Sequence, residues 1–375
     1  MACESPSSVD VRQVRVSPEV ALVLPGETQI FAAEAFGNGG VTASSAGVQW
    51  TTTDPSVATI GNGGTLQAVR EGTTMVVARL ADQADTAQVE VYDPPDFGPL
   101  EPGISYLGRR GYVEYIPGEL PVILSAPHGG RVGVPEIPNR QNGTLVGDQN
   151  TLQLTEAVRE ALIELTGFAP HVVLVHLDRA KLDANREIEE AAEGNPFAER
   201  AWLEYHDFIR SARAAIANRG EGLYLDMHGH GHVIPRVEVG YLLTREDLNR
   251  SDLSVSALRY VLQSSIRELG RDSPIPFADL LRGTTSFGGL LQAEGIPALP
   301  SPAHPMPGQD PYFSGGYSIR EHGSLVDTEL VSGIQLEHHF VGLRDTEANQ
   351  RAYAVILARV IRAFMLEHVG FFEPT

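Results

Sequence analysis

The pattern of the chain changes once, at a stretch rich in proline and glycine, and this change limits the fold more than any other feature. Residues 93–103 read DPPDFGPLEPG and carry neither a helical nor a strand period. Such a composition is typical of a semi-rigid linker. A chain of 375 residues is also comfortable for two domains. We therefore predict one domain over residues 9–92, a linker over 93–103 and a second domain over 104–375.

The segment before the linker is typical of an all-β fold. Short runs of alternating apolar and polar residues recur between turns made of glycine, asparagine and proline, and no helical period is visible. We expect a small β-sandwich in which Trp50 packs between the two sheets. The predicted strands cover residues 11–16, 29–35, 48–52, 75–79 and 86–91.

This segment resembles a bacterial Ig-like domain of the second group. The resemblance covers nearly the whole of residues 9–92. It implies an exported protein, because such domains serve there as spacers or adhesive modules. The matching motifs are Val14-x-Val16-Ser17-Pro18, Leu24-Pro25-Gly26-Glu27-Thr28, Val48-x-Trp50-x-Thr52-x-Asp54-Pro55-Ser56-Val57-Ala58 and Gly64-x-Leu66-x-Ala68-x-x-x-Gly72-Thr73.

Beyond the linker, strand-like and helix-like segments alternate. This alternation predicts a three-layer α/β domain with a mixed sheet. Apolar runs predict strands over 120–126, 172–177, 222–227, 237–243 and 333–337. A helical period with terminating signals predicts helices over 148–165, 199–218, 254–269 and 346–368.

One of these strands ends in an unusual run of histidines. Residues 223–232 read LYLDMHGHGH, with His228, His230 and His232 at alternate positions. Side chains two apart on an extended chain point the same way, and imidazole is a common zinc ligand. The segment alone is equally compatible with a histidine-rich surface loop that binds no metal.

Three further strands of this domain also end in chemically active residues. His128 follows one strand, Arg179 and Arg186 follow the next, and Glu337 ends a late strand. In an open α/β sheet, ligands bind beyond the carboxyl ends of the strands. Four strands that end in His, Arg, His and Glu therefore predict a zinc hydrolase.

These four motifs, in this order, resemble the N-formylglutamate amidohydrolase family, which shares the fold of the zinc carboxypeptidases. The resemblance runs from about Pro121 to Phe364. It implies a zinc carboxypeptidase-like fold and Zn²⁺ as the cofactor. Further matches are Gly147-Asp148, Tyr205-His206 and Tyr312-x-x-Gly315-Gly316-Tyr317-x-x-Arg320-x-x-Gly323.

A catalytic zinc site needs three protein ligands and one open position. His128 and His228 are the first two candidates. The carboxypeptidase pattern has a glutamate three residues after the first histidine, where this chain has Arg131. The family resemblance implies Asp148 instead, although aspartate at a helix start is also a favoured N-cap. Glu136 is the rival carboxylate.

The resemblance also implies the general base. Glu337 fits this role by its position at a strand end, where it would take a proton from water and return it to the leaving amine. The alternative is a carboxylate on the solvent face of the strand, because Glu337 points opposite to Leu336 on an extended chain.

The substrate-binding candidates are arginines and their neighbours. Asn185 and Arg186 resemble the pair with which these families hold a substrate carboxylate, a task suited to the planar guanidinium. Arg320 is a second candidate for the same task, and either arginine could instead form a surface ion pair. Tyr317 and His230 are further candidate substrate contacts, whereas His232 is expected at the rim.

Composition excludes several classes of function. The net charge of −20 disfavours nucleic acids and anionic membranes as partners. The chain has no G-x-S-x-G motif, and Cys3 is its only cysteine, which argues against serine and cysteine hydrolases. Because the sequence opens Met-Ala-Cys-Glu-Ser-Pro, Cys3 is a candidate lipid anchor whose signal peptide is absent from the sequence.

We therefore expect an extracytoplasmic zinc hydrolase, secreted or lipid-anchored, that cleaves an amide bond in an anionic, N-acylated amino acid or peptide-like substrate. Two alternatives stay open. One is an esterase that uses the same zinc site. The other is a cell-surface binding protein that lacks catalysis, which the missing H-x-x-E pattern favours.

Overall fold

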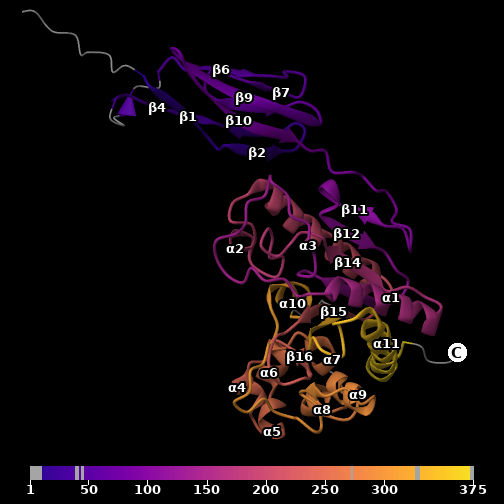
Figure 1. Ribbon diagram of the computed structural model, residues 1–375. Coiled ribbons are helices and arrows are strands. Elements are labelled where there is room, and N and C mark those ends of the chain that lie inside the picture. The colour runs from indigo at the N-terminus through magenta and orange to yellow at the C-terminus, as the bar shows by residue number, and fades with distance from the viewer. Residues whose placement is uncertain (1–10, 39–41, 44–45, 272, 326–329, 372–375) are drawn as a thin grey trace, which may run out of the picture. The chain divides into compact units, whose positions relative to one another are not determined.

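The computed structural model describes residues 11–38, 42–43, 46–271, 273–325 and 330–371 (Figure 1). These residues divide into a smaller compact unit that ends at Asp96 and a larger one that begins at Phe97. The division falls within the proline- and glycine-rich stretch expected as a linker. Cys3 lies outside the described residues. No helix among those described has the length and apolar character that a membrane span requires.

The smaller unit is built of β-strands, as predicted. Antiparallel pairs dominate among its described strands, where β2 and β10 form the one parallel pair. The sheets are β1 (Gln13–Ser17), β4 (Ala32–Phe36) and β5 (Thr42–Ala43); β2 (Val20–Val23), β10 (Gln83–Val91), β9 (Gly72–Leu80) and β6 (Gln49–Thr52); and β3 (Thr28–Ile30), β8 (Thr65–Ala68) and β7 (Ala58–Ile60).

The core of this unit explains where its strands break. Alternate residues of β9 and β10 point inward, among them Val76, Ala78 and Val89, which are fully buried. The single strand expected over 29–35 is instead two strands. Phe31 interrupts it because its ring enters the core while its N–H donates to the carbonyl of Gly64 at 2.8 Å. Trp50 is half-buried and packs against this core, as expected for a structural tryptophan.

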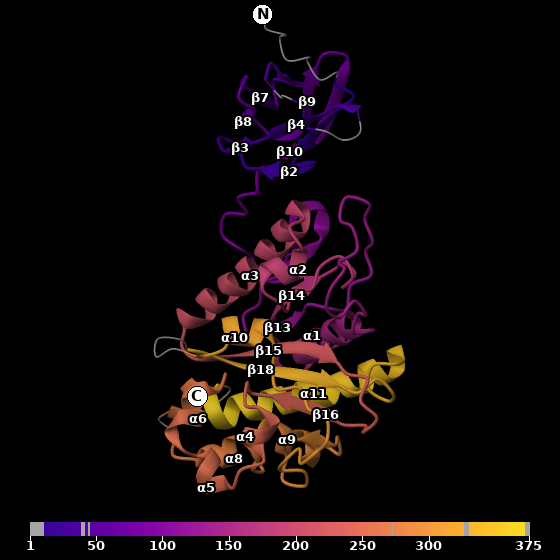
Figure 2. The same ribbon diagram turned by 90° about the vertical axis from the view of Figure 1, so that its left-hand side faces the viewer.

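The described residues of the larger unit form an eight-stranded mixed sheet. Its order is β11-β12-β14-β13-β15-β18-β16-β17, and β14, β13, β15 and β18 run parallel (Figure 2). The strands are β11 (Tyr106–Leu107), β12 (Val113–Ile116), β13 (Val122–Ala126), β14 (His171–Val175), β15 (Gly222–Gly229), β16 (Val237–Gly240), β17 (Ala298–Leu299) and β18 (Val331–His338).

Helices cover both faces of this sheet, so the expected three-layer arrangement is observed. Figure 1 shows α1 and α11 on one side of the central strands and α10 with α3 on the other. The helices are α1 (Thr151–Thr166), α2 (Ile188–Ala192), α3 (Pro196–Ala217), α4 (Arg245–Leu248), α5 (Asp252–Val255), α6 (Leu258–Gln263), α7 (Arg267–Arg271), α8 (Phe277–Arg282), α9 (Phe287–Ala293), α10 (Tyr317–His322) and α11 (Glu347–Val369).

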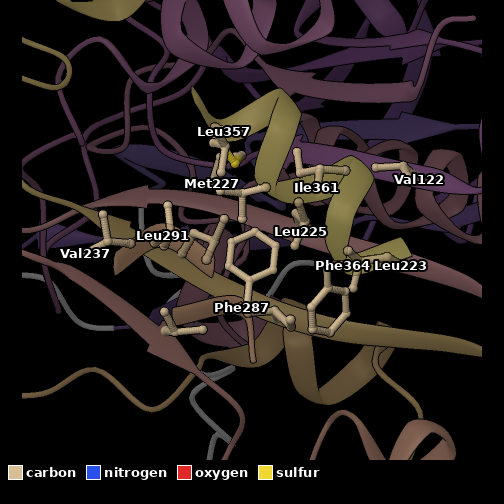
Figure 3. Packing of buried hydrophobic residues seen from close by; sticks show 14 of the residues in the cluster. Val122, Leu223, Leu225, Met227, Val237, Phe287, Leu291, Leu357, Ile361 and Phe364 are labelled. Carbon is tan, nitrogen blue, oxygen red and sulfur yellow. The ribbon is translucent and has the colours of Figure 1, made fainter. Parts of the chain in front are cut away.

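The two faces of β15 differ in chemistry. Leu223, Leu225 and Met227 point into the apolar core, where Phe287 and Ile361 pack near them (Figure 3). Because side chains alternate along a strand, the residues between them point to the opposite face. These residues are Tyr224, Asp226 and His228, all buried. One face of the strand therefore stabilises the unit, and the other carries polar groups toward the sheet edge.

One predicted helix is wrong. The helical period over 254–269 predicts a single helix, but the chain there forms α5, α6 and α7. The break follows α6 at Ser264, whose backbone is extended with ψ 146°. The next residues bond to neighbouring segments instead: the carbonyl of Ser265 accepts from the N–H of Gly333 in β18 at 2.8 Å, and Ile266 forms an isolated bridge with Ser324. These tertiary hydrogen bonds override the local helical preference.

Candidate metal centre

The carboxyl ends of the parallel strands carry the predicted site. His128 lies just beyond β13, His228 lies near the end of β15, and Glu337 lies near the end of β18. In the parallel pairing of β15 with β18, His228 is the direct partner of Glu337. Because parallel strands end at the same sheet edge, side chains 100 or more residues apart meet here.

The two histidines converge with Asp148 on one point. The Nδ1 atoms of His128 and His228 lie 3.2 Å apart. Asp148 Oδ2 lies 3.2 Å from His228 Nδ1 and 3.5 Å from His128 Nδ1. All three residues are buried, and they form one of two clusters of possible metal ligands among the described residues.

Buried carboxylates fix the orientation of both imidazole rings. The Nε2 atom of His128 lies 2.6 Å from Asp183 Oδ1, and that of His228 lies 2.8 Å from Asp226 Oδ2. A carboxylate accepts only, so each Nε2 carries a proton and donates. In the neutral rings, both Nδ1 lone pairs then face the common point. This carboxylate–histidine arrangement is the usual outer support of a metal-ligating histidine.

The spacing of the three atoms fits a tetrahedral zinc site. Zinc binds nitrogen and oxygen at about 2.0–2.1 Å, so two ligand atoms at a tetrahedral angle lie about 3.3 Å apart. The observed separations are 3.2, 3.2 and 3.5 Å. Two lone pairs and a carboxylate oxygen repel one another at this distance unless a cation or a shared proton lies between them.

Asp148 is not the N-cap of the first helix of this unit. Helix α1 begins at Thr151, and its N-cap is Asn150 in the left-handed conformation. The Oδ2 atom of Asp148 instead accepts from the backbone N–H of Gly229 at 3.1 Å. Burial alone would raise the pKa of Asp148, but the two neighbouring histidines hold it well below its usual value.

Glu136 is excluded as the third ligand by its surroundings. Its carboxylate accepts from Arg109 Nη1 at 2.7 Å and from Tyr112 Oη at 2.6 Å, and it pairs with Arg110. It is absent from both clusters of possible ligands in the described part of the chain. The rival expectation for Glu136 is therefore wrong, because two arginines and a tyrosine hold its carboxylate.

Glu337 faces the site and not the solvent. Every residue of β18 is buried, so the alternative of a solvent-facing carboxylate is wrong. Its Oε1 atom accepts from Gln335 Nε2 at 2.9 Å. Burial raises the pKa of Glu337 to about 8, even though the charge of His228 acts in the opposite direction.

The three converging residues and Glu337 line one pocket of about 690 Å³. This volume lies within the range of small-molecule sites. Asn185 and Arg186 also line it. The Oδ1 atom of Asn185 accepts from the N–H of Ser318 at 2.7 Å, and Arg186 forms an ion pair with Glu190 at 3.2 Å.

Two predicted substrate contacts lie outside this pocket. Tyr317 and Arg320 line a neighbouring hollow of about 370 Å³, which shares Asn185 and Arg186 with the main pocket. Arg320 is more than half exposed and forms an ion pair with Glu187 at 2.5 Å. The ring of Tyr317 contacts Trp202 on α3, with ring centroids 5.5 Å apart.

His230, His232 and Glu238 form the second cluster of possible ligands among the described residues. Hydrogen bonds within the protein already use the nitrogens of His230: Nε2 donates to the carbonyl of Arg236 at 2.8 Å, and Nδ1 accepts from the N–H of His232 at 3.1 Å. His232 Nδ1 lies 2.8 Å from the buried carboxylate of Glu238. The ring of His232 stacks on Phe313. The arrangement is a closed hydrogen-bond network on the pocket wall.

Two residues of the site have no role in the sequence-based prediction. Asp183 supports His128, and Arg344 lines the pocket from the loop before α11. Asp183 stands two residues before Asn185 in a motif that the sequence does single out, so its proximity to Arg186 is a usable signal. Arg344 follows no motif, and only the folded chain reveals it.

Comparison with known proteins identifies the smaller unit alone. Residues 10–91 match the family model of the bacterial Ig-like domain, group 2. The smaller unit is therefore a bacterial Ig-like domain, as the sequence predicts. No curated protein matches the chain.

Similarities to solved structures are distant. Domains 4 and 5 of the S-layer protein SbsC are 20% identical, with 22% of this chain and 52% of that chain covered and a TM-score of 0.21. The chain thus spans about half the length of that structure. Gene product Atu2144 from Agrobacterium tumefaciens is 14% identical, with coverages of 68% and 95% and a TM-score of 0.40. A GH10 xylanase with a bacterial Ig-like domain, from termite gut, is 11% identical, with coverages of 93% and 99% and a TM-score of 0.15. None of these similarities assigns an activity to the larger unit.

Proposed function

We propose that the larger unit is a zinc-dependent amidohydrolase related to the N-formylglutamate amidohydrolases, with a zinc carboxypeptidase-like fold. The observation that carries this proposal is the convergence of His128 Nδ1, His228 Nδ1 and Asp148 Oδ2 at separations of 3.2–3.5 Å. Their donor set, two imidazoles and one carboxylate, is that of catalytic zinc sites with one open position. Asp148 takes the place of the glutamate that the H-x-x-E pattern would supply.

Zinc, when bound, polarises a substrate carbonyl and lowers the pKa of a coordinated water. The residues of the chain supply the remaining functions. Asp183 and Asp226 hold the two imidazoles in the tautomer that leaves Nδ1 free. Glu337, which lines the same pocket and accepts a hydrogen bond from Gln335, would accept a proton and return it to the leaving amine.

The substrate that suits this pocket is an anionic N-acylated amino acid or a small peptide. Arg186 and Arg344 both line the pocket, and a planar guanidinium suits a carboxylate. The Ig-like unit favours a role outside the cytoplasm, where the protein would be secreted or anchored through Cys3. An esterase using the same residues is the second candidate, because zinc bound there would polarise an ester carbonyl as it would an amide carbonyl. A binding protein without catalysis is the third.

Metal analysis of purified variants tests the proposal. We expect about one zinc per chain in the wild-type protein, loss of zinc in His128→Ala, and retention in His304→Ala, which alters an exposed histidine. Glu337→Gln should keep zinc and lose turnover of N-acyl amino acids such as N-formyl-L-glutamate.

Each outcome separates the candidates. Turnover of p-nitrophenyl acetate without turnover of any N-acyl amino acid would favour the esterase. Zinc in the wild-type protein with no turnover of either class would favour the binding protein. A wild-type protein that contains no zinc and takes up none from added zinc would overturn the zinc site itself.

A further inference from the structure

Arg344 is a buried cation in the wall of the candidate metal pocket. It lies in the short segment between β18 and α11 and is only 4% exposed, yet it lines the pocket together with His128, His228 and Glu337. A charged group this deeply buried is stable only with partners that satisfy it. Its contacts therefore indicate which kind of group Arg344 can bind.

The described partners of Arg344 are neutral. Its Nε donates to the carbonyl of His338 at 3.1 Å, its Nη2 to that of His230 at 3.3 Å, and its Nη1 to that of Gln149. A guanidinium has five N–H groups, so two are left over. Among the residues that the structure describes, no carboxylate lies within 4 Å of it. The three carbonyls orient the guanidinium, while the carboxylates of Asp148 and Glu337 act on its charge only from beyond ion-pair distance.

The other two arginines of the pocket differ in this respect. Arg179 pairs with Asp183 at 3.0 Å and with Asp148 at 3.4 Å. Arg186 pairs with Glu190. Of the arginines that line the pocket, Arg344 is thus the one that forms no ion pair with a carboxylate within 4 Å among the described residues. A ligand carboxylate would supply that partner and gain a charge-assisted hydrogen bond.

A glycine places the guanidinium beside the proposed zinc ligands. A Cβ atom built on Gly229 would lie 2.3 Å from the central carbon of the guanidinium, so any larger residue would displace it. Gly229 follows His228 directly, and its N–H donates to Asp148 at 3.1 Å. A carboxylate held by Arg344 would therefore lie close to the reacting end of the pocket.

We propose that Arg344 binds the carboxylate of the ligand and that the ligand class is an N-acyl α-amino acid, whose carboxylate carbon lies two bonds from the amide nitrogen. The assignment rests on the proposed function, because the zinc-binding residues define where the amide group of the ligand would lie. Carboxylate binding itself needs no zinc, so the two proposals fail separately.

The test compares N-acetyl-L-alanine with its uncharged analogue N-acetyl-L-alaninamide. Binding of each is measured by ligand-observed NMR on chelator-treated and on zinc-loaded full-length protein. We expect the wild-type protein to bind the carboxylate in preference to the amide in both states. Arg344→Met should weaken carboxylate binding at least about 10-fold, the loss expected when a hydrogen bond to a charged group is removed. Arg351→Met, which alters an exposed arginine, should bind like the wild type.

Two further variants cover the case in which Arg344→Met does not fold. Arg344→Lys keeps the charge but loses the fork of donors, and Gly229→Ala keeps the arginine but displaces it. Both should weaken binding of N-acetyl-L-alanine while circular dichroism stays unchanged. Equal binding of carboxylate and amide by the wild type, or a loss of binding in Arg186→Met but not in the Arg344 variants, would overturn the assignment. Arg344-dependent binding in a protein that takes up no zinc would support the assignment of Arg344 to the ligand carboxylate and overturn the proposed zinc site.

Discussion

Asp148 Oδ2 lies 3.2 Å from His228 Nδ1, although the two residues are 80 positions apart in the chain. The contact joins the segment before α1 to the end of β15, and His128 from the end of β13 completes it. Each imidazole is held from behind by a carboxylate of its own. The proposed zinc site depends on this meeting point and on the carboxylates that support it.

Replacing Asp226 by asparagine should weaken zinc binding without abolishing it. Asp226 Oδ2 accepts from His228 Nε2 at 2.8 Å and so keeps Nδ1 free as a ligand. Loss of such an outer partner typically costs 10–100-fold in metal affinity. We expect a decrease of about 10–100-fold in Asp226→Asn, measured by competition with a chromophoric chelator. Asp207→Asn, which alters an exposed carboxylate on α3, is the control. Equal affinity in Asp226→Asn and wild type would contradict the proposed support.

Glu136→Gln should leave zinc affinity unchanged but destabilise the protein. The Glu136 carboxylate binds the buried guanidinium of Arg109, and this ion pair is lost in the variant. Leaving a buried donor poorly satisfied costs about 1–3 kcal/mol. The same measurements on Asp148→Asn should give the opposite pattern, with zinc affinity strongly reduced. A large loss of zinc in Glu136→Gln would restore Glu136 as the third ligand.

Stability should fall on acidification because of two buried histidines. His206 Nε2 donates to the carbonyl of Ala184 at 3.1 Å, so its Nδ1 accepts from His322 Nε2 at 2.8 Å, and both rings are neutral. Burial, with a smaller effect of Arg210, lowers the pKa of His206 to about 3. Burial also lowers the pKa of His322.

The sign follows from proton uptake. Below pH 6.5 the unfolded chain binds protons at these two histidines and the folded chain does not, so the free energy of unfolding decreases as the pH falls. The stabilisation is complete above pH 6.5 and is lost toward pH 3. For His206 alone we expect a loss of about 2 kcal/mol between pH 6.5 and 5. Urea unfolding of chelator-treated protein at both pH values measures it. His206→Gln should show a shallower dependence; an equal slope in variant and wild type would refute the prediction.

Leu225→Ala should destabilise the larger unit by about 2–5 kcal/mol, the usual cost of a large-to-small change in a core. Leu225 is fully buried on the apolar face of β15 (Figure 3). Val355→Ala on α11 is the control, since Val355 is 44% exposed and such surface changes stay within about 0.5 kcal/mol. In a Trp50→Phe background, the fluorescence of Trp202 reports the unfolding of this unit alone. A change below 1 kcal/mol in Leu225→Ala would show that the site collapses around the cavity.

Local pattern in the sequence determines the two-part organisation and the position of most strands. Alternation of apolar residues is a property of neighbours in the chain, so β9, β10, β13 and β15 can be predicted without tertiary information. The same holds for the polar residues that end β13, β15 and β18, including His128, His228 and Glu337. Family resemblance then pointed to Asp148, which local pattern alone could not distinguish from a helix cap.

Only the tertiary structure decided the contacts between these segments. Glu136 pairs with Arg109, Asp183 supports His128, and Arg344 is buried with no carboxylate within 4 Å among the described residues. No local period in the sequence relates the residues that meet in these places. The break of the predicted helix at Ser264 has the same origin, since hydrogen bonds to the sheet outweigh local helical preference there. The sequence pattern predicts which face of a strand a residue points to. It does not predict which residues meet on that face, because this depends on how distant strand ends are brought to one edge of the sheet.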